Sequence, residues 1–318
     1  MAPHQSAQPL FGIALKVIST LAFAGMATLI KLVSDRYPVG EIVFFRSFFA
    51  LIPVFAWAAG RDRRLSSVVT VFHTTRPTNH LIRSAAGVTG MFLGFAALTR
   101  LPIADATAIG YASPLLTVIS AVIILKEKVH IFRWTAVGVG LVGVLVILSD
   151  YVVPNAGGHE RSVFGATLAI AAAMTGALAS TYTRSLTRYE SAATIVVYFS
   201  SLCALVGLCT LPFGWQWPDG RDALFLVLAG IFGGLGQVFL TQCYRFGDAS
   251  TIAPFDYTSM IWVLIVSLTV FGTWPSHTVL TGTAIVIAAG LFVIWREHKL
   301  GIERTRSRRA QTPTTPLS

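Results

Sequence analysis

Residues 99–128 read TRLPIADATAIGYASPLLTVISAVIILKEK, and residues 244–274 read YRFGDASTIAPFDYTSMIWVLIVSLTVFGTW. An Asp-Ala pair opens the apolar part of each stretch, and 143 positions separate the pair at Asp105 from the pair at Asp248. A long apolar run follows each pair and is interrupted early by a proline. Similarity over such a distance indicates that the chain consists of two related halves.

The interrupting prolines fall in matching places, Pro114 in the first half and Pro254 in the second. Proline removes a backbone donor and crowds the preceding turn, so we expect each to break its helix. Within a bilayer the freed carbonyl groups need partners or water in a cavity. Duplicated apolar halves with such breaks are typical of secondary transporters, and the breaks point to the binding site. A packing kink without function is the alternative.

Composition indicates a membrane environment. Hydrophobic residues make up 54% and charged residues 12% of the 318 residues, with a mean hydropathy of +0.69. Soluble domains carry about 25% charged residues. The apolar residues come in blocks of roughly 16 to 24, which suits a hydrocarbon layer about 30 Å thick. The net charge is +10. The charged residues lie between the apolar blocks and near the C-terminus, so their pattern does not predict nucleic-acid binding.

The apolar blocks predict an all-α integral membrane protein with ten transmembrane helices. A linker at 150–162 separates five helices from five, and an odd number of spans per half inserts the second half upside down. We therefore expect two inverted five-helix repeats, at 10–150 and 163–296, and a basic cytoplasmic tail at 297–318. The expected helices are 10–33, 41–59, 83–99, 105–125, 133–149, 163–183, 192–213, 223–243, 249–271 and 278–295.

Lysine and arginine placement predicts the orientation of the chain. With a cytoplasmic N-terminus, 17 of the 24 basic residues fall on the cytoplasmic side and 4 on the opposite side. Cytoplasmic loops carry such an excess, so both termini are expected in the cytoplasm. Six of the seven tryptophans fall at expected helix ends, where aromatic rings form interfacial belts. The first apolar stretch is longer than a signal-peptide core and is expected to remain as a helix.

Further motifs accompany the repeat: Arg46 in FFRSFFAL, ADATAIGYASPLLTVISAVIILKEKV in the first half, and DASTIAPFDYTSMIWVL followed by FGTWP in the second. Over residues 10–296 the chain resembles the EamA-type branch of the drug/metabolite transporter superfamily. The resemblance implies a bacterial inner-membrane carrier of small organic molecules that works by alternating access without ATP. Thr273 departs from the pattern, because an acidic residue is expected there to match Glu127.

The wording FFRS and SPLLTVISAVIILKE looks most like subgroups that include riboflavin and S-adenosylmethionine uptake carriers. This resemblance makes riboflavin, or a similar vitamin or cofactor-type compound, the leading candidate substrate for uptake. An exporter of amino acids or drugs with the same fold is an alternative, and so is a passive facilitator or channel.

Asp256 is the leading candidate for a functional charge, because it lies about eight residues inside the ninth expected helix. A carboxylate at that depth costs several kcal/mol unless it is paired, protonated or in contact with water. It is therefore a candidate for binding a substrate cation or for proton coupling. A structural ion pair with Lys31 or Arg46 is the alternative.

Arg46 and Lys31 are candidate binding residues of the opposite charge. Arg46 is suited to an anionic substrate group, but it could also reach the headgroups or pair with Glu41. Lys31 and Lys16 lie near opposite ends of the first helix, where snorkelling to the headgroups is the expected behaviour.

Aromatic and amide side chains near the prolines form a third group of candidates. Tyr111 and Tyr257 each lie within one turn of a proline, and Trp262 and Gln237 are further polar or aromatic residues in these segments. Rings that also carry a hydroxyl, amide or N–H group suit a planar organic substrate. Packing against lipid or the core is the alternative.

Nothing in the sequence predicts an enzyme, a metal site or a cofactor. There is no HExxH or GxSxG motif, all seven histidines fall outside the expected helices, and the three cysteines lie in apolar runs. The expected partners are a small-molecule substrate, coupled protons and the lipid bilayer, and a homodimer is compatible with the pattern.

Overall fold

The computed structural model describes residues 9–62, 72–126, 131–152, 163–187, 189–246 and 252–311, and these contain helices and turns but no strand. The all-helical prediction is confirmed. The helices are α1 (Pro9–Val33), α2 (Val39–Asp62), α4 (Pro77–Leu98), α5 (Ile103–Gly110), α6 (Ala112–Leu125), α7 (Ile131–Val152), α8 (Val163–Leu186), α9 (Ala192–Leu208), η1 (Leu211–Phe213), α10 (Gly220–Phe246), η2 (Ala253–Tyr257), α12 (Thr258–Thr269) and α13 (His277–Gln311).

Eight helical stretches of the described chain are long and apolar enough to cross a membrane. One of them, Ile103–Ile124, includes both α5 and α6. Two further apolar helices, Ala192–Leu208 and Phe255–Thr269, are shorter. All ten expected segments therefore correspond to apolar helical stretches, whereas ten as the number of membrane crossings stays a prediction.

Several helix boundaries differ from the prediction. α4 begins at Pro77 rather than at residue 83, because proline is well suited to a first turn whose N–H groups need no helical acceptor. His80 is consequently helical and buried, with its ring centroid 4.7 Å from that of Tyr198. The prediction that every histidine lies outside the helices is therefore wrong. α9 ends at Leu208, and η1 contains the next proline, Pro212.

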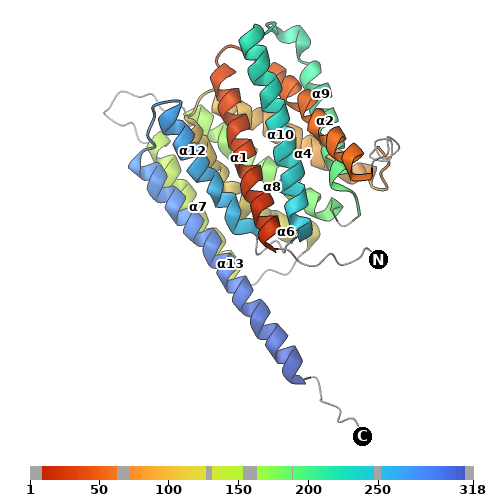
Figure 1. Ribbon diagram of the computed structural model, residues 1–318. Helices are drawn as coiled ribbons and strands as arrows, with labels where there is room; N and C mark the ends of the chain where they lie inside the picture. Colours follow the sequence, from red (N-terminus) through yellow and green to blue (C-terminus); the bar gives the residue numbers. More distant parts are fainter. Residues whose placement is uncertain are drawn as a thin grey trace.

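The C-terminal helix is longer than predicted. α13 continues to Gln311, so the expected tail at 297–318 is helical over its described part. Figure 1 shows this helix leaving the bundle at the end where α1 begins. An even number of crossings would produce this arrangement.

The helices pack in pairs that join the two halves of the chain. α1 packs against α10, α4 against α8, α7 against α13, and α2 against both α9 and α10 (Figure 1). Glycine allows the closest approach: a Cβ added to Gly143 of α7 would lie 2.8 Å from the carbonyl oxygen of Gly282 in α13. Small residues at such contacts let membrane helices pack backbone against backbone.

A carboxylate outside the spans joins the turn before α9 to the turn before α4. Glu190 Oε1 accepts hydrogen bonds from Thr74 Oγ1 (2.9 Å), Thr75 N (3.0 Å) and Thr75 Oγ1 (3.2 Å). Partial burial raises the pKa of Glu190, but the three hydrogen bonds and nearby His80 outweigh it, so the pKa lies below its ordinary value. The ionised form therefore stabilises the folded state.

Glu190→Gln is expected to lower the free energy of unfolding by about 1 kcal/mol at neutral pH, because charge-assisted hydrogen bonds are lost. A lowered folded-state pKa contributes stability above the unfolded pKa of about 4.3 and loses it as pH falls through the folded pKa. Thermal unfolding in detergent should therefore separate variant and wild type at neutral pH but not in acid. Asp35→Asn, at an exposed carboxylate, is the matched control. Equal melting at neutral pH would contradict this role.

Candidate transport site

The helical segments that contain Pro114 and Pro254 are both interrupted. Tyr111 lies between α5 and α6 with φ −67° and ψ −5°, and Pro114 is the third residue of α6. Because Pro114 has no N–H, the carbonyl group of Gly110 lacks its usual helical donor. In the second half Pro254 is the second residue of the 3₁₀ segment η2, which leads directly into α12.

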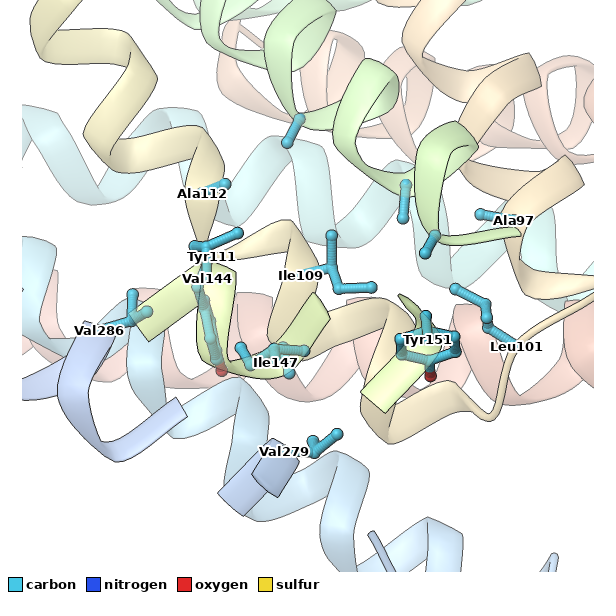
Figure 2. Close-up of a cluster of buried hydrophobic side chains, with 14 of the residues drawn as sticks. Ala97, Leu101, Ile109, Tyr111, Ala112, Val144, Ile147, Tyr151, Val279 and Val286 are labelled. Carbon is cyan, nitrogen blue, oxygen red and sulfur yellow. The ribbon is translucent and has the colours of Figure 1, made fainter. Parts of the chain in front are cut away.

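The two interruptions meet inside the bundle. The hydroxyls of Tyr111 and Ser259 are hydrogen-bonded at 2.7 Å, and the rings of Tyr111 and Tyr257 lie 5.4 Å apart in a T-shaped arrangement. Figure 2 shows Tyr111 at the α5–α6 break among buried side chains that include Val144 and Val286. The breaks expected from the sequence are thus brought into contact.

Asp256 forms an ion pair with Lys16, whose Nζ lies 2.5 Å from Asp256 Oδ1. The lysine side chain is 2% exposed and the aspartate side chain 40% exposed. The alternative partners, Lys31 and Arg46, are therefore wrong, and so is the expectation that Lys16 reaches the headgroups. The physical reason is that the face of α1 bearing Lys16 packs against η2, which brings the carboxylate within reach.

The same face of α1 contacts α12 one turn later. Thr20 Oγ1 lies 2.8 Å from Thr258 Oγ1, and Trp262 Nε1 donates a hydrogen bond to Thr20 Oγ1 at 3.2 Å. Lys16 and Thr20 are four residues apart, so both point toward the broken segment. One polar cluster therefore contains Asp256, Tyr111, Tyr257 and Trp262. Two residues of α1 join it: Lys16, and Thr20, which the sequence did not single out.

Three of the candidate residues, Lys31, Gln237 and Arg46, lie outside this cluster. Lys31 is 15 residues beyond Lys16, or about 22 Å along α1, and its Nζ donates to the Leu98 carbonyl group at 2.6 Å. Gln237 is half-buried on α10, and within the described chain no residue hydrogen-bonds to its side-chain amide.

Asp248 and Glu127 of the repeated motifs lie outside the described residues. Thr273, the position that departs from the family pattern, hydrogen-bonds to Ser267 at the end of α12.

Arg46 is buried on α2, so it neither snorkels nor pairs with Glu41. Five residues correspond to about 140° around a helix axis, which points the two side chains in different directions. Glu41 instead accepts a hydrogen bond from the backbone N–H of Gln216 at 3.1 Å. Arg46 Nε lies 3.4 Å from the sulfur atom of Met26, and the guanidinium carbon is 6.0 Å from the Phe199 ring centroid.

A second buried arginine, Arg83 of α4, contacts the same ring. Its guanidinium carbon is 4.0 Å from the Phe199 centroid, and its Nε donates to Thr183 Oγ1 at 3.1 Å. The sequence placed Arg83 at a membrane surface, because the helix was expected to begin there. Its burial follows from the earlier start of α4.

Neither arginine is neutralised within the described chain. Nη1 of Arg46 and Nη1 of Arg83 make no hydrogen bond there, and none of the described carboxylates lies within 4.0 Å of either guanidinium. Burying an unpaired ion costs several kcal/mol, whereas a cation–π contact supplies about 2 kcal/mol. The contacts to Phe199 therefore offset only part of that cost.

A helical bundle with proline-broken segments and buried charges at its centre is the architecture of a membrane transporter. The profile of the EamA-like transporter family matches the chain over residues 10–149 and again over 163–295. The chain therefore belongs to the EamA-like transporter family, and it is a transporter rather than an enzyme.

Several curated proteins are similar along most of their length. An uncharacterized transporter of Helicobacter pylori (strain ATCC 700392 / 26695) is 30% identical over 89% of this chain and 94% of the relative. The S-adenosylmethionine uptake transporter of Rickettsia felis is 27% identical over 91% of this chain and 94% of that one. The riboflavin transporter of Vibrio cholerae is 30% identical over 71% of this chain and 74% of the relative.

A solved crystal structure has the same fold, with a TM-score of 0.63 and 21% identity, and covers 90% of this chain and 98% of the other. At that identity the likeness extends to the fold alone.

Gly290 of α13 gives a direct test of how Tyr257 is placed. A Cβ at Gly290 would run into the Tyr257 hydroxyl, so Gly290→Ala should force the ring out of position and destabilise the protein by about 1–3 kcal/mol. Gly138→Ala is the matched control, because a Cβ there meets open space, and alanine favours a helix by about 0.5–1 kcal/mol. Thermal unfolding should rank the variants accordingly. Equal stabilities would show that Tyr257 does not occupy the space beside Gly290.

Proposed function

We propose that this protein is a secondary transporter that moves a small organic metabolite across the bacterial inner membrane by alternating access. The observation that carries the proposal is the meeting of two broken segments, one from each half, beside the ion pair of Lys16 and Asp256. Broken helices that converge on polar residues are where transporters of this kind bind substrate and coupling ion.

An inverted arrangement of the two five-helix repeats is part of this proposal. The packing of α1 on α10 has a counterpart in the packing of α8 on α4, with the halves exchanged. The contact of α1 with α12 likewise corresponds to that of α8 with α6. The family profile also matches each half separately. These correspondences support a two-fold relation between the halves. Ten crossings with both termini in the cytoplasm are part of the proposal, and rocking of one repeat against the other would expose the site alternately.

We assign the coupling role to Asp256. Its side chain is 40% exposed although it lies in an apolar helical segment, and a carboxylate facing hydrocarbon would be costly. Water access to this carboxylate is therefore part of the proposal. Protonation would neutralise Asp256 and release Lys16 from the ion pair, which changes the contact between α1 and η2. Proton binding and helix movement would then be linked.

The proposed substrate is a vitamin- or cofactor-type compound with a planar ring. Relatives named as S-adenosylmethionine and riboflavin transporters support this class, and riboflavin remains a candidate beside S-adenosylmethionine. Tyr111, Tyr257 and Trp262 lie around the broken segments, where aromatic faces suit a planar ring.

Counterflow tests the proposal. Purified protein in vesicles preloaded with unlabelled compound should take up the same labelled compound transiently above its equilibrium level, using S-adenosylmethionine and riboflavin as probes. Such an overshoot requires a carrier whose site faces one side at a time. Uptake of a probe without any overshoot would instead identify a passive facilitator.

Asp256→Asn is expected to abolish uptake driven by an imposed proton gradient, because an amide does not take up the coupling proton. The variant should remain in the membrane and melt as a folded protein. Asp35→Asn, at an exposed turn, should retain gradient-driven uptake. An Asp256→Asn variant with wild-type gradient-driven uptake would remove this residue from the coupling role.

A further inference from the structure

Two arginines, Arg46 of α2 and Arg83 of α4, form a stack with the Phe199 ring of α9. We call the two arginines the arginine pair. Arg46 is the eighth residue of the apolar stretch 39–60, and Arg83 the seventh of 77–98. Consecutive spans cross in opposite directions. Arg46 therefore lies about 10 Å from one membrane face, and Arg83 about 10 Å from the other. Their long side chains meet at Phe199, near the middle of the bundle.

We propose that the arginine pair binds the anionic group, a carboxylate or phosphate, of the transported solute; the inference rests on the proposed transport function. Guanidinium groups stay charged in proteins and present several donors in a planar fork that matches carboxylate and phosphate oxygens. The Nη1 atoms of Arg46 and Arg83 are buried and have no protein acceptor among the described residues. A ligand anion would supply both the missing acceptors and the missing charge.

The surroundings are shaped to hold the pair. A Cβ at Gly233 of α10 would lie 2.8 Å from Arg46 Nε, and a Cβ at Gly87 of α4 would lie 2.6 Å from the Phe199 ring. The absence of both side chains gives the stack its space. The hydroxyls of Ser84 and Ser200, which follow Arg83 and Phe199 in sequence, are also buried without a hydrogen-bond partner in the described chain.

The arginine pair and the broken segments lie at different depths. Met26, beside Arg46, is six residues beyond Thr20, which contacts Trp262. Six residues correspond to about 9 Å along α1. A solute with a ring at one end and an acidic group at the other would therefore bridge the aromatic cluster and the arginines. S-adenosylmethionine has a carboxylate of this kind, whereas riboflavin carries no ionised group at neutral pH.

The test compares two pairs of probes, each differing in one anionic group: S-adenosylmethionine with its decarboxylated form, and flavin mononucleotide with riboflavin. Ligand-induced thermal stabilisation of the purified full-length protein reports binding, and vesicle uptake reports transport. In at least one pair the anionic member should bind at least about tenfold more tightly. Arg46→Met and Arg83→Met should abolish that preference. Arg100→Gln, at an exposed arginine, should keep it.

The same variants separate binding from a structural role. Removing an unneutralised buried cation should leave the melting temperature of the ligand-free protein unchanged or higher, while the ligand-induced shift is lost. A fall in ligand-free melting temperature with the anion preference intact would overturn the proposal. Equal binding within both pairs would also overturn it.

The outcomes distinguish this inference from the proposed function. Uptake that ignores the anionic group and survives both methionine variants would leave transport standing and refute the anion site. Anion-dependent binding without uptake would leave the anion site standing and refute the transport of these compounds.

Discussion

A charge inside a bilayer must find an opposite charge, a hydrogen-bond partner or water, and this constraint organises the centre of the molecule. Lys16 and Asp256 satisfy it by pairing with each other across α1 and η2. Buried Asp105 accepts a hydrogen bond from the Tyr151 hydroxyl. The guanidinium groups of Arg46 and Arg83 have no such neutralising partner in the described chain, which is the reason for proposing an anion site there.

The broken helices position the ion pair of Lys16 and Asp256. An unbroken helix satisfies its own backbone and presents only side chains, whereas the interruption at Tyr111 leaves the Gly110 carbonyl group without its usual helical donor where the two halves meet. The hydrogen bond between Tyr111 and Ser259 joins the interruptions, and Lys16 holds the second one against α1. A movement that separates α1 from η2 must therefore break an ion pair.

The sequence was sufficient for features that depend on residue type and spacing. Apolar blocks predicted the helical segments, and Pro114 predicted an interruption that the structure places just before it. It was not sufficient for features that depend on how helices are rotated and where they begin. Lys16 looked like an anchor because nothing in the sequence shows that its face of α1 meets η2. Arg83 and His80 looked like surface residues because α4 begins earlier than its apolar run suggests.

Alternating access requires the meeting point of the broken segments to open to one side of the membrane at a time. A cysteine at Ser259 in an otherwise cysteine-free chain, labelled with a membrane-impermeant reagent from either side of oriented vesicles, tests it directly. Labelling is expected from both sides, and a transported solute should change the two labelling rates in opposite directions. Labelling from one side only, or two rates that rise and fall together, would contradict alternating access.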